Sequence, residues 1–309
     1  MFKESFFGLA GLRKVSGECK VNRGMFHKYS QDVAFFPYIF LNAYNVFNDE
    51  NSLGFRMRED FYKLSNRDKS HKVIAIFGGS AVYDITSIEP FSKKLEILLR
   101  KRGKKVDVLN FGICNGTILD EINAYLLFVY NIKPDIVISY SGANDFGHAQ
   151  YSDVHLNYVY SKFYIDFAYD IIQKENNFQF NIQNSSFKII NEYISKIHQF
   201  KNIVESNGGE FLYILQPYYK SKKELSPKEK NNISLYLKKN IGINTSNNVL
   251  QNLDVIYNNF DLKMKYLNLH KFFKKFNTKH TLFHDIVHLN NNGSSLVSNI
   301  IFKEIINYV

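Results

Sequence analysis

The sequence predicts an α/β protein with a three-layer α/β/α fold, in which helices cover both faces of a five-stranded parallel sheet. Two observations predict this fold. From residue 72 onward, short apolar runs that suit buried strands alternate with longer stretches of helical periodicity. Several of these apolar runs also end in turns that carry glycine or polar residues, as parallel strands do before a crossover helix.

The first predicted strand is the apolar run 72–77, which leads into the turn Gly78-Gly79-Ser80. An unbroken apolar run is typical of a strand that is buried on both faces. The next segment, 89–101, carries large apolar residues at helical spacing and stops before a glycine. The remaining predicted elements are a strand at 106–111, a helix at 118–131, a strand at 134–140, a helix at 188–206, a strand at 210–215, helices at 227–240 and 248–265, a weak strand at 266–269 and a helix at 293–307.

The chain divides into two parts at about residue 70. Residues 1–70 show no regular periodicity but carry many large apolar side chains, so we expect an N-terminal extension that packs on the main domain. Residues 71–309 form the predicted α/β domain. Within it, residues 146–187 interrupt the alternation after the third strand, and an insertion at this place is a candidate lid or specificity element.

The chain is basic, with 39 Lys and Arg against 29 Asp and Glu and a formal net charge of +10. Segment 220–239 holds seven lysines against two glutamates, and segment 261–279 holds six lysines against one aspartate, so each contributes +5. A solvated helical surface is the favoured interpretation of both segments. The alternative is a basic flank that attracts an anionic ester substrate. Nucleic-acid binding is disfavoured because it rests on charge alone.

Composition excludes several classes of protein. The two cysteines, Cys19 and Cys114, rule out a disulfide scaffold and a cysteine-based zinc site, and we expect Cys114 to be a partly buried structural thiol. No apolar run approaches the roughly 20 residues that span a bilayer. The first apolar patch is interrupted early by Lys3 and Glu4 and does not resemble a signal peptide. We therefore expect a cytoplasmic protein with no transmembrane segment, and no cofactor is predicted.

Small and polar residues follow three of the predicted strands. Ser80 comes after the first strand, Gly112 after the second and Asn144 after the third. Because the carboxyl ends of parallel strands meet at one edge of a sheet, these residues are expected to line one crevice. Near the C-terminus, Asp285 and His288 are three residues apart, which places them on one face of a helical turn.

These residue types are the parts of an acyl-transfer site. A serine hydroxyl is a weak nucleophile that needs an adjacent base, and His288 can serve Ser80 in this way. Asp285 would fix the tautomer of the histidine and stabilise its imidazolium form. The tetrahedral oxyanion needs fixed hydrogen-bond donors. The backbone N–H groups of Ser80 and Gly112 and the side-chain amide of Asn144 can supply them.

Four blocks of the sequence, in this order, resemble the SGNH (GDSL-like) hydrolase superfamily and in particular its bacterial Gly-Gly-Ser members. The blocks are Phe77-Gly78-Gly79-Ser80, Asn110-Phe111-Gly112, Gly142-Ala143-Asn144-Asp145 and Asp285-Ile286-Val287-His288. The resemblance implies a flavodoxin-like sheet and an activity on acyl esters, either hydrolysis or acyl transfer. The sequence departs from the family pattern at two positions, since Gly79 and Ala81 stand where the Gly-Asp-Ser-Leu motif has Asp and Leu. We expect the substrate to contact Gly79, Ala81, Asp145 and His284.

The leading hypothesis is a serine esterase, with an O-acetyl group on a carbohydrate or glycoconjugate as the expected substrate. Two alternatives stay open: a carbohydrate O-acyltransferase that uses the same residues, and a catalytically degenerate protein that binds glycans or takes part in their assembly. No metal site is predicted. The four-residue spacing of His280, His284 and His288 could line one helical face, but the resemblance places this segment in a loop and already gives His288 a role.

Overall fold

A five-stranded parallel sheet forms the centre of the molecule, with strand order β4-β3-β5-β6-β7. The computed structural model describes residues 34–36, 39–41, 48–150, 185–240, 243–275 and 279–309. The strands are β3 (Lys72–Gly78), β4 (Val106–Gly112), β5 (Ile136–Ser141), β6 (Glu210–Leu215) and β7 (Tyr266–Asn268). In this order the second strand of the sheet lies outside the first, as in flavodoxin-like sheets. The predicted fold class is confirmed.

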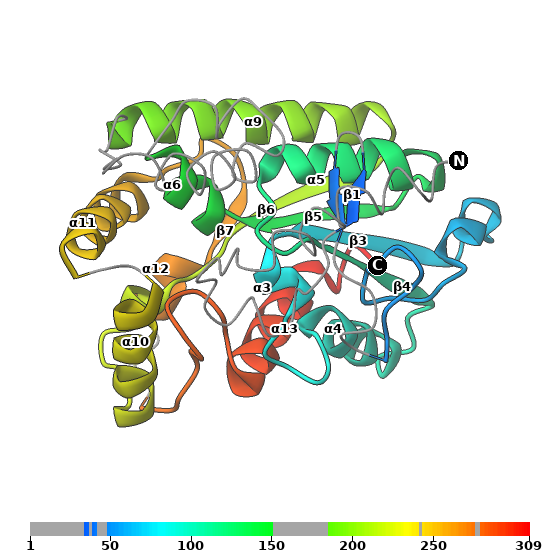
Figure 1. The fold of residues 1–309 in the computed structure, drawn as a ribbon. Coiled ribbons are helices and arrows are strands. Elements are labelled where there is room, and N and C mark those ends of the chain that lie inside the picture. Colours follow the sequence, from blue (N-terminus) through cyan, green and yellow to red (C-terminus); the bar gives the residue numbers. More distant parts are fainter. Residues whose placement is uncertain (1–33, 37–38, 42–47, 151–184, 241–242, 276–278) are drawn as a thin grey trace, which may run out of the picture.

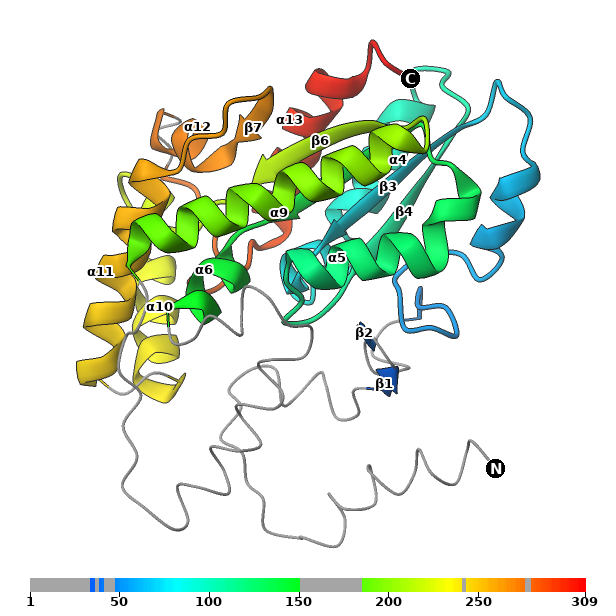
Figure 2. The same ribbon diagram turned by 90° about the horizontal axis from the view of Figure 1, so that it is seen from above.

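Helices cover both faces of the sheet (Figures 1 and 2). One face carries α5 (Ile118–Ala124), its continuations η2 (Tyr125–Val129) and η3 (Tyr130–Ile132), and α9 (Ser186–Ser206). The other face carries α4 (Phe91–Arg100) and α13 (Asn291–Ile305). All four helices predicted at these places are present. Within the described part of the chain, no helix has the length and apolar character needed to cross a membrane.

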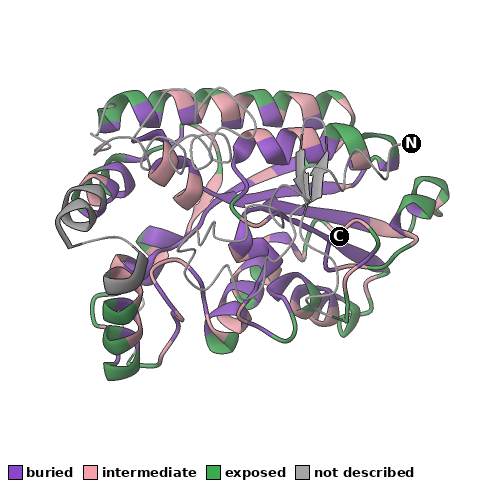
Figure 3. Cartoon of the chain, in the orientation of Figure 1, coloured by how far each residue is buried: buried purple, intermediate pink, exposed green. Residues whose placement is uncertain are grey.

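Strands β3, β4 and β5 are buried because helices pack on both sides of them, whereas the edge strand β7 is half-buried (Figure 3). All residues of β4 are buried, and only Lys72 at the start of β3 is partly exposed. Phe77 of β3 stacks on Phe111 of β4 with ring centroids 5.0 Å apart, and Phe200 of α9 meets Phe77 edge-on at 5.6 Å. The apolar runs of the sequence therefore correspond to strands that are covered on both faces, as predicted.

Several helices lie beyond the carboxyl ends of the strands, at the centre and left of Figure 1. They are α3 (Ser80–Tyr83), α6 (Ala143–Ala149), η4 (Tyr219–Ser221), α10 (Pro227–Asn240), α11 (Ile243–Asn259) and α12 (Leu269–Lys275). The sequence did not predict α3, α6 or α12, because four to seven residues are too few to show a helical period. The helix predicted at 248–265 starts and ends about six residues earlier, as α11.

The insertion predicted at 146–187 is described only at its two ends. Its first residues belong to α6 and its last two begin α9. Residues 151–184 lie outside the described part of the chain, so the proposed lid or specificity role of the insertion stays a prediction.

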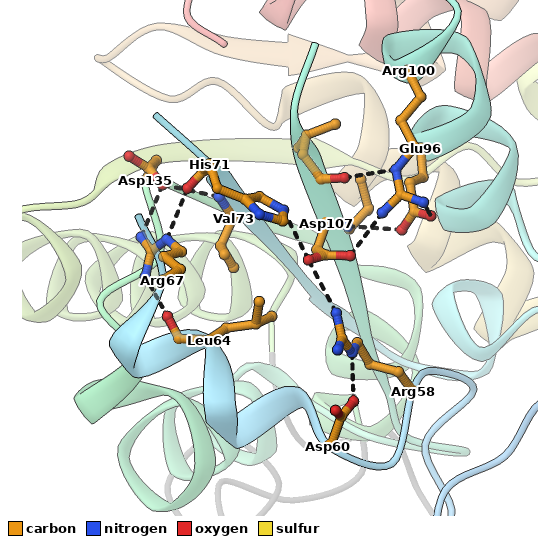
Figure 4. Close-up of polar contacts among 12 residues, drawn as sticks. Arg58, Asp60, Leu64, Arg67, His71, Val73, Glu96, Arg100, Asp107 and Asp135 are labelled. Atoms are coloured by element: carbon orange, nitrogen blue, oxygen red, sulfur yellow. Dashed lines mark hydrogen bonds and ion pairs between the residues drawn. The ribbon is translucent and has the colours of Figure 1, made fainter. Parts of the chain in front are cut away.

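Residues 48–70 pack along the β4 side of the sheet, from the carboxyl end of β4 near Phe111 to the amino ends of the strands. Phe55 and Phe61, the latter in η1 (Phe61–Asn66), meet Phe111 edge-on. Figure 4 shows the ion pairs at the amino ends of the strands, including Arg58 with Asp107 and Arg67 with Asp135. Of the preceding residues the structure describes only β1 (Ala34–Phe36) and β2 (Ile39–Leu41), which pair antiparallel. The packing of the extension 1–70 as a whole stays a prediction.

Candidate active site

Ser80 is the first residue of α3 and stands at the carboxyl end of β3. The backbone N–H groups of Val82 and Tyr83 turn back to the carbonyl of Gly79, which closes the single helical turn. The N–H of Ser80 lies in the first turn of that helix, where it has no carbonyl partner within the helix. It is therefore available to a bound group.

Two buried polar side chains hold α3 in place. The guanidinium of Arg56 donates to the carbonyls of Tyr83 (3.3 Å), Asp84 (2.9 Å) and Ser87 (3.0 Å), just after the helix. The amide of Asn110, on β4, donates to the carbonyl of Val82 (2.8 Å). Because the carbonyls at the end of the turn are held from two sides, Ser80 sits on a rigid support.

Ser80, His288 and Asp285 form a continuous hydrogen-bonded chain. The Oγ of Ser80 lies 2.7 Å from Nε2 of His288, and Nδ1 of His288 lies 2.7 Å from Oδ2 of Asp285. The other carboxylate oxygen, Oδ1, accepts from the backbone N–H groups of Val287 (2.9 Å) and His288 (2.8 Å). All three side chains are buried. The chain can move a proton from the hydroxyl to the imidazole and stabilise the imidazolium that results.

The pKa shifts of His288 and Asp285 favour this proton transfer. Burial alone would lower the pKa of His288, but the charge of Asp285 and its hydrogen bond outweigh burial and raise the pKa above its usual value. Burial alone would raise the pKa of Asp285, but His288 and the two backbone N–H groups hold it below its usual value. Asp285 therefore stays ionised, and His288 is a stronger base than a free histidine.

Asn144, the second residue of α6, brings its amide beside the nucleophile turn. Its Nδ2 donates one hydrogen to the carbonyl of Gly116 (2.8 Å), and the amide carries a second hydrogen. A side chain at position 79 would place its Cβ only 2.4 Å from this Nδ2. The glycine at position 79 therefore lets the amide approach the residue before Ser80.

Gly112 is not placed as the sequence predicted, because its N–H is already used. This N–H donates to Oδ1 of Asn110 (2.9 Å) within the same strand. A Cβ at position 112 would lie 2.0 Å from the backbone nitrogen of Tyr83. The glycine is thus required for the close packing of β4 on α3, and its assignment as an oxyanion donor is corrected.

Sequence reasoning missed Asn115, which lies in the turn after β4. The turn is closed by a hydrogen bond from Gly116 N–H to the carbonyl of Ile113 (2.9 Å), and it touches Asn144 through Gly116. Asn115 has a left-handed backbone (φ 66°) and is exposed, and in the described part of the chain its N–H makes no hydrogen bond. The Asn-Gly pair is a turn signal in the sequence that could have directed attention here.

Asp145 does not face a substrate, contrary to the prediction. Its carboxylate is buried beneath the site, where Oδ1 accepts from the backbone N–H of Ile118 (2.9 Å). Two more buried carboxylates lie close by, those of Asp120 and Glu121. Burial raises the pKa of Asp120 to about 6, of Asp145 to about 7 and of Glu121 to about 8. The three groups form a buried acid cluster that binds protons near neutral pH.

This acid cluster predicts that the protein loses stability as the pH rises. Since the folded-state pKa values lie above the ordinary ones, the folded protein binds more protons than the unfolded chain between about pH 4 and 8. The free energy of unfolding should therefore fall across this interval. In Asp145→Asn the slope of the free energy of unfolding against pH should be smaller, by the contribution of up to about one bound proton. Urea unfolding at pH 5.5 and pH 8 measures this, and an unchanged slope in the variant contradicts it.

The predicted substrate contacts Ala81 and His284 adjoin Ser80 and Asp285 in the sequence, and their contact with a substrate stays a prediction. Ala81 is half-buried on α3. His284 is half-buried, its backbone N–H donates to the carbonyl of His288 (2.8 Å), and burial lowers the pKa of its imidazole. Cys114 is half-buried, and burial raises the pKa of its thiol to about 12, which makes it a poor nucleophile.

The lysines of the two basic segments, 220–239 and 261–279, do not all stand free on the surface to attract a substrate. Lys222 is buried and paired with Glu229, so it cannot attract a substrate. Lys220 pairs with Asp254 and Lys265 with Glu304.

Residues 279–290 form a loop with a single β-bridge instead of a helix, so the spacing of the three histidines does not align them. Among the described residues, no group of three His, Cys, Asp or Glu side chains is placed to hold a metal ion.

Comparisons with known proteins find similarity at the level of structure. No family model and no curated protein matches the sequence. An acetyl xylan esterase, AlAXEase, matches with 14% identity over 75% of this chain and 99% of its own, at a TM-score of 0.43. A lipase/acylhydrolase from Enterococcus faecalis matches with 16% identity over 76% and 96% of the chains, at 0.44. The acetylxylan esterase Axe2 from Geobacillus stearothermophilus matches with 13% identity over 77% and 96%, also at 0.44. TM-scores below 0.5 carry no inference about function, so the function has to be inferred from the site itself.

Proposed function

We propose that this protein is an SGNH-type serine hydrolase that cleaves an acyl ester, with an O-acetyl group on a carbohydrate or glycoconjugate as substrate. One observation carries the proposal: the buried hydrogen-bonded chain from Ser80 through His288 to Asp285, with 2.7 Å at each link. Four sequence blocks that resemble this superfamily contribute the residues of the chain and the neighbouring amide. A nucleophile that is only 3% exposed also favours a small acyl group such as acetyl.

In the proposed mechanism, Oγ of Ser80 attacks the ester carbonyl while Nε2 of His288 takes its proton. The new C–O bond gives a tetrahedral oxyanion, and Asp285 stabilises the imidazolium. When the intermediate collapses, His288 returns the proton to the departing sugar oxygen and an acyl-serine remains. A water molecule then attacks the acyl group, with His288 as base again, and releases the carboxylic acid and free Ser80.

We assign the oxyanion site to three donors. They are the N–H of Ser80, the second amide hydrogen of Asn144, and the N–H of Asn115 in place of that of Gly112. The first is supported by its position in the opening turn of α3, and the second by the approach of Asn144 to Gly79. Asn115 is supported by its exposed left-handed turn beside Asn144. Fixed donors of this kind stabilise the transition state more than the substrate.

Asn144→Ala is expected to lower kcat by about 10²- to 10³-fold with a much smaller change in KM, because the amide acts on the oxyanion and not on the bound ester. Steady-state hydrolysis of p-nitrophenyl acetate measures both constants. Asn207→Ala is the matched control, since its amide also donates two hydrogen bonds, to the Tyr125 hydroxyl and the Tyr130 carbonyl, but precedes the amino end of β6, away from Ser80. A raised KM at unchanged kcat would remove Asn144 from the oxyanion site.

The proposed function itself is tested with a panel of acetylated sugars and a fluorophosphonate probe. We expect release of acetate from at least one sugar ester and covalent labelling of Ser80 by the probe. If acetyl groups move to an added sugar hydroxyl in preference to water, the protein is an O-acyltransferase. Folded protein that neither hydrolyses nor transfers, and that the probe does not label, would be a degenerate member with a binding role.

A further inference from the structure

Asp285 and His288 lie at the tip of a hairpin-like loop, residues 281–290, which we call the base loop. Its two arms run antiparallel and meet in a bridge between Phe283 and Leu289. Two backbone hydrogen bonds close it, from His284 N–H to the carbonyl of His288 (2.8 Å) and from Asn290 N–H to the carbonyl of Leu282 (2.8 Å). The position of the tip therefore depends on what holds the first arm.

A buried carboxylate from α10 holds that first arm. Oε1 of Glu229 accepts from the backbone N–H groups of Leu282 (2.8 Å) and Phe283 (3.0 Å). Its other oxygen, Oε2, accepts from the N–H of Ser226 (2.7 Å) and from the Nζ of Lys222 (2.7 Å). Glu229 is 0% exposed, so one side chain joins the amino end of α10 to the arm that precedes Asp285.

Two further contacts extend this junction along the arm. The Nζ of Lys222 also donates to the carbonyl of His280 (2.7 Å), and the hydroxyls of Ser226 and Thr281 lie 2.8 Å apart. Four consecutive residues of the chain, from His280 to Phe283, are thus held by α10 and the segment before it. Further along the loop, the N–H of Tyr219 donates to the carbonyl of Ile286 (2.8 Å) and fixes the tip from another side.

Stability alone does not explain an ion pair at this place. Removing two charges from water carries a large desolvation penalty, and apolar side chains of similar volume often replace such pairs without loss of stability. What an apolar pair cannot provide is an acceptor for the two N–H groups of the base loop. Burial opposes the ionised form of Glu229, yet Lys222 and the three backbone N–H groups hold its pKa below the usual value, so the carboxylate remains charged.

We infer that Glu229, together with Lys222, is a positioning residue that sets the distance between His288 and Ser80. The inference rests on the proposed function for its kinetic consequence. It gives part of the lysine-rich segment 220–239 a structural task, since Lys222 neutralises the carboxylate that anchors the base loop. A displacement of about 1 Å at a reacting group can cost about 10²-fold in rate.

Glu229→Gln tests the inference with an isosteric change. An amide has one acceptor oxygen, whereas the carboxylate serves two pairs of donors with two oxygens. The charge of Lys222 should draw the amide oxygen toward itself, which turns the NH₂ group toward the N–H groups of Leu282 and Phe283. We expect kcat for p-nitrophenyl acetate to fall about 10- to 100-fold with KM changed far less, since His288 and not the ester is displaced.

The matched control is Glu96→Gln on α4. Glu96 is also buried, pairs with Lys93 and Arg100, and accepts from the backbone N–H of Val108, but Figure 4 shows it beside Asp107, at the amino end of β4. We expect lower stability and unchanged kcat for this control. In the double variant Lys222→Met/Glu229→Gln, the amide oxygen is free to turn back to the base loop, so kcat should recover at least severalfold over Glu229→Gln.

Several results would overturn the inference. Wild-type kcat in folded Glu229→Gln, or an equal fall of kcat in Glu96→Gln, removes the positioning role. If Glu229→Gln does not fold, Glu229→Asp keeps the charge but withdraws the carboxylate, and it must lower kcat without a matching change in KM. If Ser80→Ala leaves activity unchanged, the proposed function fails separately. In that case hydrogen exchange alone tests the positioning role. Glu229→Gln must still speed amide exchange at Leu282, Phe283 and His288. Unchanged protection of these amides contradicts the positioning role.

Discussion

Ser80→Ala is expected to lower kcat for p-nitrophenyl acetate and for any cleaved sugar acetate by about three orders of magnitude or more. Without Oγ there is no atom to form the acyl-enzyme, and His288 loses the hydroxyl that lies 2.7 Å from its Nε2. The residual rate should come from the oxyanion donors, which are left in place. Steady-state kinetics and a single-turnover acylation assay measure the loss.

The fold should tolerate this change. Ser80 is only 3% exposed, and the loss of its hydroxyl removes one hydrogen bond without adding volume. Ser298→Ala is the matched control, because Ser298 is equally buried and its hydroxyl donates to the carbonyls of Phe91 and Ser294, away from the site. Circular dichroism should be unchanged in both variants. If Ser80→Ala hydrolyses p-nitrophenyl acetate as fast as the wild type, Ser80 is not the nucleophile.

Asp285→Asn is expected to cost about 10³- to 10⁴-fold in kcat, although it replaces one oxygen by NH₂. The two backbone N–H groups at Oδ1, from Val287 and His288, require an oxygen there. The NH₂ group must then face Nδ1 of His288, which makes that nitrogen the acceptor. The proton consequently moves to Nε2, and Nε2 can no longer accept the proton of Ser80. The tautomer is wrong although the geometry is kept.

The pH dependence of the same variant gives an independent readout. In the wild type, His288 must be neutral to act as base, and Asp285 raises its pKa above the usual value. The acidic limb of kcat/KM should therefore lie above pH 6.5 and move to lower pH in Asp285→Asn, since the carboxylate charge is gone. Asp107→Asn, a buried carboxylate at the other end of the sheet (Figure 4), should leave kcat and the limb unchanged. An unshifted limb in Asp285→Asn would contradict the assignment of the acidic limb to His288.

The sequence is sufficient to predict the sheet and the residues that stand at its strand ends. Long apolar runs mark strands that are buried on both faces, and the glycine-bearing turns after them mark the edge of the sheet where Ser80 and Asn144 lie. Ser80 and Asn144 are predicted as site residues in this way, and Asp285 and His288 are predicted as a pair by their spacing. These features are local in the chain, so their residue types carry the information.

Features that depend on packing between distant segments could not be predicted. Gly112 is a glycine because α3 approaches within 2.0 Å of a would-be Cβ, and a steric glycine looks the same in a sequence as one that binds an oxyanion. Asp145 follows Asn144 directly in the chain, but its side chain lies in the buried acid cluster and not at the site. Glu229 sits among lysines in a segment that suggested a solvated surface, and only the folded structure brings it to Leu282 and Phe283.

The proposed nucleophile and its base are 208 residues apart in the chain. A ribosome-bound chain that ends before residue 288 has Ser80, Asn115 and Asn144 but no histidine to activate the hydroxyl. The contacts that hold α13, the helix after the base loop, also join residues far apart in the chain. The Ser294 hydroxyl donates to Asp84 after α3 (2.8 Å), and the Ser298 hydroxyl donates to the carbonyl of Phe91 (3.0 Å). Closure of such long loops is slow compared with local folding. During synthesis the protein should therefore gain its chemistry only after the five strands of its parallel sheet, which all precede residue 288, have been made. No nascent chain that stops before residue 288 should carry a reactive serine.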